Sequence, residues 1–428
     1  MALSVFLLAL LTASCSRPPR PNVVVIVIDT LRTDHLSFHG YAKDTTPFLS
    51  TLALRSADFI RAYAGSSWTA PATASIFTGL YPFQHGVVMG LLAQKKSLKN
   101  DPSIKINRIP EKLRTLPEVF QANGYRTFGI SDNPNISRKQ GFDQGFDRLQ
   151  THRHTGAQNI NRKLLAMSKE IRSASRYFLY IHYNDPHRPY KLRLSEEERS
   201  GDWLTDMKRR YDKELAHVDG CIRELYRHFG WERDTLLVIT ADHGEEMMEK
   251  GVYGHGSSLF NTVIHVPLLF HYPGHRGIAA GKVEAEVSTL DILPTLGGLL
   301  GFSRLDDLSG KDLSPWLKSA RAASAQRTVY SHLQLKSPGK PDFVQKAAIA
   351  GDFKYLFQAP QALSFFFDLK NDPREAHNLY ESRQEDARKL AASLFSFERS
   401  CKRYNPDYVD IQLDAKSIEH LKTLGYIQ

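Results

Sequence analysis

Runs of apolar residues alternate with helix-like patterns along most of the chain. Residues 23–28 form an unbroken β-branched run, which is typical of a strand covered on both faces. Between the apolar runs, residues 204–229 and 287–300 place apolar side chains at helical spacing. Alternating strands and helices predict the α/β class, with a mostly parallel central sheet and helices on both faces. The further apolar runs expected to form strands are residues 125–131, 177–183, 235–240 and 266–271.

The pattern changes near residue 320. Short strands separated by turns are expected there, and they are typical of an antiparallel meander: residues 328–332, 346–349, 354–357 and 365–369. A helix over 384–397 and a final short helix should follow. We therefore expect a main domain over 22–320 and a small C-terminal antiparallel α+β subdomain over 321–428.

The first residues have the composition of a secretory signal peptide followed by a short tether, together spanning residues 1–21. Residues 3–11 are apolar but too few to span a bilayer, and small residues then lead into Cys15. The pattern predicts export to the periplasm or cell envelope. It also resembles a bacterial lipoprotein signal, in which a lipidated Cys15 anchors the protein to a membrane. Two features depart from that signal: no Lys or Arg precedes the apolar run, and Thr12 stands where Leu is commoner.

Composition excludes several classes of protein. The chain has 428 residues, 42% hydrophobic and 24% charged, which is typical of a globular protein. The formal net charge of +10 suits an anionic partner. The basic groups lack the interleaved aromatic residues of a nucleic-acid surface, so no nucleic-acid partner is expected. Besides Cys15, only Cys221 and Cys401 are present, too far apart for a disulfide framework, and Cys221 is expected to be a buried free thiol.

Carboxylates and imidazoles follow the predicted strands at the point where each strand ends. Asp29 follows the first strand, Asp185 and His187 follow the third, and Asp242 and His243 follow the fourth. Ligands of open α/β sheets bind beyond the carboxyl ends of the strands. An Asp in this place often only caps the next helix, but three strand ends together favour a metal site. Oxygen and imidazole ligands suit Zn²⁺, Mn²⁺, Mg²⁺ or Ca²⁺.

The segment from Gly65 to Gly79 predicts a helix whose start bears a hydroxyl. Pro71 suits the first turn and Thr69 suits the N-cap. The free N–H groups and partial positive charge of a helix N-terminus favour an anion. Beside a divalent cation, the Thr69 hydroxyl would lose its proton more easily and become a nucleophile. Taken alone, the segment is better explained by a plain helix cap.

These residues together resemble the sulfatase family of the alkaline phosphatase superfamily. The resemblance runs nearly end to end after residue 21, through the motifs at residues 22–36, 69–87, 185–190, 240–245, 254–256, 290–295 and 367–379. It implies an alkaline phosphatase-like catalytic domain. It places Asp29, Asp242 and His243 on metal-binding positions and Thr69 on the nucleophile. His187 and His255 fall on positions that contact the transferred anionic group, and Asp185 is expected to contact the substrate, join a second metal or orient His187.

The departures from the family pattern bear on the reaction. Family sulfatases carry at the Thr69 position a Cys or Ser that is oxidised to formylglycine, and a threonine cannot form that aldehyde. Thr69 instead resembles the branch with phosphodiesterases and phosphoethanolamine or phosphoglycerol transferases. Thr30 replaces a second Asp of many sulfatases, Thr73 replaces an Arg, and His255 replaces a Lys. The loss of a carboxylate and the gain of an imidazole favour Zn²⁺ or Mn²⁺ over Ca²⁺.

The main hypothesis from the sequence is a metal-dependent hydrolase or transferase acting on phosphate esters of the phosphodiester type through Thr69. His255 is expected to donate a proton to the leaving oxygen. The first alternative is a sulfuric ester hydrolase that lacks formylglycine, and the second is a non-catalytic envelope protein that binds an anionic ligand. A lipid headgroup or an envelope glycan fits as substrate. The sequence leaves open the natural substrate, the identity and number of metals, hydrolysis versus transfer, and the oligomeric state.

Overall fold

The computed structural model describes residues 20–90, 103–272, 278–303, 305–318, 327–336, 341–405 and 408–412. Its centre is an eight-stranded sheet in which all neighbours are parallel except around β12, which runs antiparallel to β2 and β8. This confirms the predicted α/β class with a mostly parallel sheet. The strand order is β13 (Gly281–Val283), β2 (Ala57–Phe59), β12 (Leu268–His271), β8 (Thr235–Thr240), β1 (Asn22–Ile28), β7 (Tyr177–Tyr183), β5 (Arg126–Ser131) and β6 (Arg148–Thr151).

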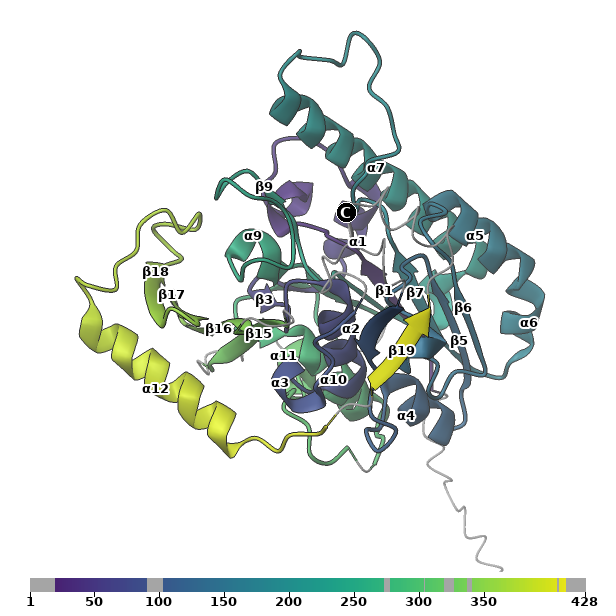
Figure 1. The fold of residues 1–428 in the computed structure, drawn as a ribbon. Helices are drawn as coiled ribbons and strands as arrows, with labels where there is room; N and C mark the ends of the chain where they lie inside the picture. Colours follow the sequence, from purple (N-terminus) through teal and green to yellow (C-terminus); the bar gives the residue numbers. More distant parts are fainter. Residues whose placement is uncertain are drawn as a thin grey trace, which may run out of the picture.

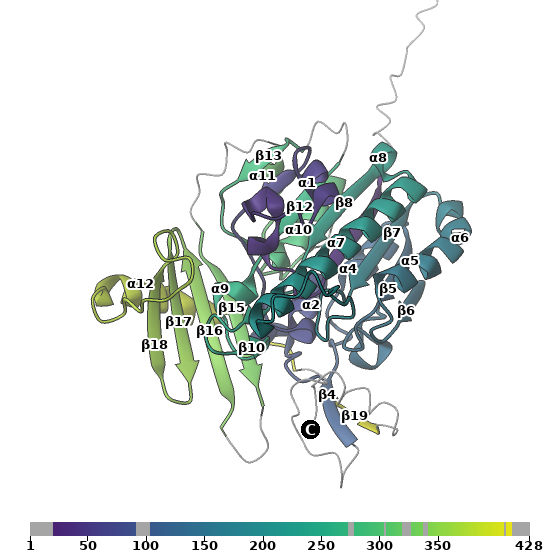
Figure 2. The same cartoon turned by 90° about the horizontal axis from the view of Figure 1, so that it is seen from above.

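Helices cover both faces of this sheet (Figures 1 and 2). Alternate side chains of β1 belong to different cores: Val23, Val25 and Val27 pack on one face, and Val24, Ile26 and Ile28 pack on the other. This period of two explains why the whole run is apolar. The first face is covered by α2 (Thr69–Thr78), α4 (Leu116–Ala122) and α10 (Ile292–Leu300), and the second by α1 (Pro47–Ala53), α5 (Ala157–Ala166), α6 (Ser168–Ser173) and α7 (Trp203–Phe229).

The C-terminal part forms a second, antiparallel sheet, as predicted. Its order is β15 (Val329–Leu335), β16 (Phe343–Ala350), β17 (Phe353–Ala359) and β18 (Leu363–Asp368). The helix α12 (Gln384–Ser400) packs on it through Leu394 and Ala387 (Figure 1). A buried ion pair between Lys354 Nζ and Glu375 Oε1, 2.7 Å apart, joins β17 to the loop after β18. Lys354 also donates to the carbonyl of Leu259, which ties this sheet to the main domain.

Smaller elements complete the described chain. The pairs β9 (Glu246–Met247) with β10 (Tyr253–Gly254), and β4 (Ser103–Asn107) with β19 (Tyr408–Gln412), form two-stranded sheets. A three-stranded sheet contains β11 (His265–Val266), β3 (Ala62–Tyr63) and β14 (Val287–Ser288). The remaining α-helices are short: α3 (Pro82–His85), α8 (Trp231–Asp234), α9 (Asn261–Ile264) and α11 (Ser314–Leu317). The 3-10 turns are Thr33–His35, Ser37–His39, Arg138–Gln140 and Thr289–Asp291.

Several local predictions need comment. The helix expected over 287–300 begins only at Ile292, because Val287 and Ser288 pair with β3 and the Ser288 side chain accepts from the Leu290 N–H. Cys221 is a buried free thiol, as expected. The final short helix, Cys15 with its signal segment, and the boundary near residue 320 lie outside the described residues. Among the described residues, no helix is long and apolar enough to cross a membrane.

Candidate active site

The carboxyl ends of β1, β7 and β8 bring distant polar residues to one edge of the sheet. Ile28 is in register with Tyr183 and Val27 with Thr240, so the residues that follow β1 and β8 emerge side by side. Asp29 is fixed there by its backbone N–H, which donates to the Tyr183 carbonyl at 2.9 Å. This edge is where open α/β sheets bind their ligands.

Four buried side chains form a compact cluster at this edge. His243 Nε2 lies 3.6 Å from Asp29 Oδ1 and 3.5 Å from Asp242 Oδ2. His182 Nε2 lies 3.3 Å from Asp29 Oδ2 and 3.9 Å from Asp242 Oδ2. All four side chains are fully buried, and Asp29, His182 and Asp242 have ligand atoms close enough together to hold a metal ion.

The chemistry of this cluster fits a divalent cation. Asp29 Oδ1 and Asp242 Oδ2 are buried with no hydrogen-bond donor among the described residues. Such oxygens are costly unless a cation or another donor reaches them. Burial opposes ionisation of Asp29, but its hydrogen bond to His182 and the nearby imidazoles lower its pKa far below the usual value. Burial and the charge of Asp29 raise the pKa of Asp242, and a bound cation would remove that repulsion.

Thr69 lies at the first position of α2, beside the cluster. Its Oγ1 is 3.5 Å from Asp29 Oδ2 and 3.4 Å from His243 Nε2, and the residue is fully buried. The N-cap is Trp68 and its side chain makes no cap hydrogen bond, so the N-cap assignment for Thr69 was wrong by one residue. As a result the hydroxyl points at the cluster and not at the helix's own N–H groups.

Asn133, a residue that the sequence pattern did not single out, contacts both Thr69 and Asp29. Its Nδ2 donates to Asp29 Oδ2 at 2.7 Å and to Thr69 Oγ1 at 3.2 Å. Its Oδ1 accepts from the backbone N–H of Asn135 at 2.9 Å, which fixes the orientation of the amide. Because Asn133 donates to Thr69 Oγ1, this bond strengthens when the hydroxyl loses its proton.

His187 and His255 form an outer layer over the cluster. The ring centroids of His243 and His255 are 4.5 Å apart, and those of His187 and His255 are 4.9 Å apart. His255 Nδ1 lies 2.9 Å from Glu245 Oε1, while its Nε2 is buried with no partner among the described residues. Burial lowers the pKa of His187 to about 4, and burial followed by the charge of His243 lowers the pKa of His255. Burial therefore favours the neutral form of both rings.

Asp185 lies in different surroundings from the other predicted residues. Its carboxyl adjoins that of Glu214 on α7, and the Glu214 Oε1 accepts from the backbone N–H groups of Lys191 and Leu192. Burial and this second carboxyl raise the pKa of Glu214 to about 7. Asp185 and Glu214 therefore anchor the loop after β7, which bears His187.

Three residues of the site were absent from the sequence prediction: His182, Asn133 and Glu245. His182 is a polar residue within an otherwise apolar strand, and Asn133 follows the end of β5, a further strand of the same parallel sheet. Both signals are present in the sequence. Glu245 lies inside the motif that holds Asp242, but only the fold shows its contact with His255.

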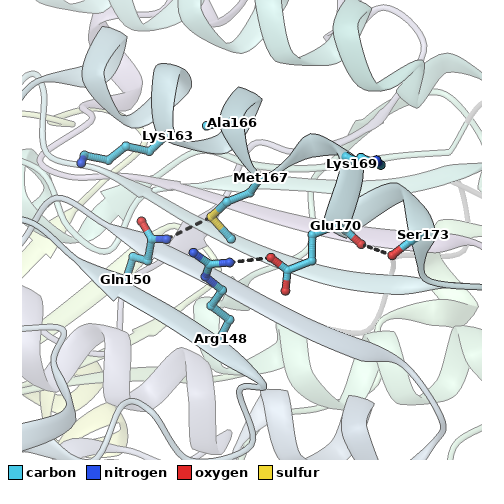
Figure 3. Close-up of a pocket in the computed structure, with 8 residues that line it drawn as sticks. All are labelled: Arg148, Gln150, Lys163, Ala166, Met167, Lys169, Glu170 and Ser173. Atoms are coloured by element: carbon cyan, nitrogen blue, oxygen red, sulfur yellow. Dashed lines mark hydrogen bonds and ion pairs between the residues drawn. The ribbon is translucent and has the colours of Figure 1, made fainter.

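A hollow lies at the edge strand β6 of the sheet, and its lining includes no residue of the cluster (Figure 3). It measures about 590 Å³ and is lined by residues of β6, α5 and α6 and of the turn between the two helices. Its Arg148 pairs with Glu170 and its Gln150 donates to the Met167 sulfur, so these polar groups already have partners. We place the chemistry at the carboxyl edge of the sheet and not in this hollow.

The doubly wound fold and the polar cluster around Thr69 define an α/β protein with a candidate metal centre. Comparison with known families makes this specific: the chain belongs to the sulfatase family, whose profile matches residues 21–302. A second profile, N-sulphoglucosamine sulphohydrolase, C-terminal, matches residues 249–398.

Individual relatives are distant but match over most of their length. The ulvan-active sulfatase of Formosa agariphila is 24% identical over 85% of this chain and 77% of its own. The Δ4,5-hexuronate-2-O-sulfatase of Bacteroides thetaiotaomicron is 22% identical over 98% of this chain and 96% of its own. Among solved structures, the phosphonate monoester hydrolase of Agrobacterium radiobacter superposes with a TM-score of 0.72 at 20% identity, covering 93% of this chain and 99% of that one. This last likeness concerns the fold.

Proposed function

We propose that this protein hydrolyses sulfate esters of glycans through Thr69, with Zn²⁺ or Mn²⁺ in the cluster of Asp29, Asp242, His243 and His182. The observation that carries the proposal is the buried Thr69 hydroxyl, 3.4 to 3.5 Å from His243 and Asp29. The family profile and the sulfatase names of the relatives favour sulfate over phosphate esters. This reverses the order of preference drawn from the sequence, in which the phosphodiester reading came first.

A bound divalent cation would supply positive charge for the Thr69 alkoxide and for an oxygen of the ester. Thr69 Oγ1 attacks the sulfur, a Thr69–sulfate bond forms and the bond from sulfur to the leaving oxygen breaks. Asn133 stabilises the Thr69 oxygen by its fixed N–H donor. Water then attacks the sulfur and gives one proton to His255 as the Thr69–sulfate bond breaks. The Thr69 oxygen takes the second proton of that water, which replaces the proton released to solvent when the alkoxide formed.

In this proposal His255 moves the proton in both steps. The negative charge of a bound ester favours the protonated imidazole, and Glu245 at 2.9 Å from Nδ1 stabilises that form. Nε2 then donates to the leaving oxygen and later accepts the proton of the attacking water. His187 contacts the same anionic group from the neighbouring position, since its ring lies against that of His255.

The test compares three matched esters: 4-nitrophenyl sulfate, 4-nitrophenyl phosphate and bis(4-nitrophenyl) phosphate. We expect the sulfate to have the highest kcat/KM, Thr69→Ala to lose at least about 10³-fold, and mass spectrometry of quenched enzyme to find sulfate on Thr69. Wild-type turnover in Thr69→Ala would refute the role of Thr69. Thr69→Ser serves as the control that keeps a hydroxyl.

A second candidate function, hydrolysis of phosphate or phosphonate esters, is favoured by one observation. A threonine cannot become the aldehyde that lets family sulfatases expel sulfate, and a structural neighbour is a phosphonate monoester hydrolase. A higher kcat/KM on bis(4-nitrophenyl) phosphate, with phosphate on Thr69, would establish this candidate in place of the first. The non-catalytic alternative predicts no turnover of any ester together with retained binding.

Export with a lipid anchor at Cys15 is part of the proposal. It rests on the apolar segment and the small residues before Cys15. Palmitate labelling of the expressed protein should disappear in Cys15→Ser. Labelling that persists in that variant would refute the anchor.

A further inference from the structure

Beside the proposed active site, a small aromatic and cationic surface extends from His255 toward the start of α7. It consists of Arg188, Trp203 and Tyr253. Figures 1 and 2 show the start of α7 next to the β9–β10 hairpin, which bears Tyr253. The Trp203 and Tyr253 ring centroids lie 5.6 Å apart at an interplanar angle of 82°, and the Arg188 guanidinium carbon lies 4.9 Å from the Tyr253 centroid.

Arg188 is held next to the reactive centre. A Cβ at Gly254 would come within 2.8 Å of Arg188 Nη2, so the guanidinium lies against the hairpin immediately before His255. The backbone carbonyl of Arg188 accepts from His187, and this contact does not depend on the Arg188 side chain.

The Arg188 guanidinium has N–H donors that are not used by acceptors in the described part of the chain. Arg188 Nε is buried and has no acceptor among the described residues, and no described carboxylate lies within ion-pair distance of Arg188. A planar guanidinium binds a planar carboxylate through two parallel hydrogen bonds. Its stacking on Tyr253 orients the fork and leaves the edge of the guanidinium available.

Trp203 supplies an open ring face in the same place. It is 59% exposed, an unusual state for a tryptophan in a folded domain. Exposed aromatic rings that adjoin a catalytic site present a flat apolar surface with a polar edge, which suits the face of a sugar ring. Val252, 41% exposed, continues this surface along the hairpin.

We propose that Arg188, Trp203 and Tyr253 form a subsite that binds a hexuronate, with Arg188 on its carboxylate and Trp203 against its ring. The inference rests on the proposed function, because it assigns the sugar that carries or adjoins the reacting sulfate ester. A named relative that acts on a hexuronate 2-O-sulfate is consistent with this chemistry. With this subsite the protein would bind both anionic groups of the substrate: the sulfate ester at the candidate metal centre and the carboxylate at Arg188.

The first experiment measures binding, so that its outcome is separate from turnover. Thr69→Ala protein is titrated with a 2-O-sulfated hexuronate disaccharide and with the same disaccharide whose carboxylate is reduced to an alcohol. Tryptophan fluorescence and calorimetry report the Kd. We expect the carboxylate form to bind about 10- to 100-fold more tightly, and Arg188→Met in this background to remove that difference. Trp203→Ala should weaken the binding of both disaccharides and abolish most of the fluorescence change.

The control is Arg193→Met, an exposed arginine of the same loop, which should keep the preference for the carboxylate. Arg188→Lys keeps the positive charge but not the paired N–H donors of the guanidinium, so it should retain only part of the preference for the carboxylate form. The subsite would be overturned if the Thr69→Ala parent bound the two disaccharides with equal affinity. It would also be overturned if Arg188→Met lowered the affinity for both disaccharides by the same factor. Failure of the proposed function would appear differently, as an absence of ester turnover by the unsubstituted protein.

Discussion

Replacement of Asn133 by alanine should slow turnover by about 30-fold. Asn133 donates to Thr69 Oγ1 at 3.2 Å and to Asp29 Oδ2 at 2.7 Å, and the Asn135 N–H fixes both donors. A hydrogen bond to a charged group contributes about 1.5–3 kcal/mol, and the bond to Thr69 gains its charge only as the hydroxyl loses its proton. We take about 2 kcal/mol as the loss from the transition state, which corresponds to about 30-fold at about 1.4 kcal/mol per decade.

The assay is the kcat and KM of Asn133→Ala on 4-nitrophenyl sulfate, with metal content measured on the same sample. An effect through the Thr69 oxygen lowers kcat with little change in KM. Asn133→Asp keeps the shape but places a carboxylate against Asp29 Oδ2, so its loss should be larger than that of Asn133→Ala. Turnover within about 2-fold of the unsubstituted protein, at equal metal content, would refute this account of Asn133.

Three further outcomes follow from the described contacts. EDTA should abolish turnover and lower the Tm, because a ligand that binds only the folded state stabilises it. Urea unfolding should show that the free energy of unfolding falls as the pH rises from about 4.5 to 7. Burial raises the pKa of Glu214 from 4.5 to about 7, so in this range the folded state holds a proton that the unfolded chain loses. Glu214→Gln should flatten the decline. Lys354→Met should cost about 3–5 kcal/mol by leaving Glu375 buried and unpaired, and Lys354→Met with Glu375→Leu should restore most of it.

For each of these three predictions, one outcome would contradict it. Full activity and an unchanged Tm after exhaustive EDTA treatment, with no metal found, would remove the metal from the proposal. A flat stability profile in the unsubstituted protein would contradict the account of Glu214. If Lys354→Met and the double variant are equally destabilised, the cost arises from lost packing and not from the uncompensated charge of Glu375.

The sequence predicted five strands of the main sheet, β1, β5, β7, β8 and β12, because their apolar runs are a local signal, whereas the short strands β2, β6 and β13 were not predicted. A run such as Val23 to Ile28 must be buried on both faces, whichever strands become its neighbours. Ligands gather at the carboxyl ends of parallel strands, and this rule alone predicts that Asp29, Asp242 and His243 lie together. In the structure His243 Nε2 lies 3.6 Å from Asp29 Oδ1 and 3.5 Å from Asp242 Oδ2.

Only the tertiary structure decided the rest of the site. Whether His182 faces the cluster depends on the order of β7 beside β1, and strand order is a long-range choice that no local pattern encodes. The same holds for Asn133, which reaches Thr69 from the end of β5, and for Asp185, which turns to Glu214 on α7 and not to the cluster. The sequence by itself determined which residue types stand at the strand ends. The packing of β5, β7 and α7 decided which of those side chains meet, because side-chain direction depends on neighbours that lie far apart in the chain.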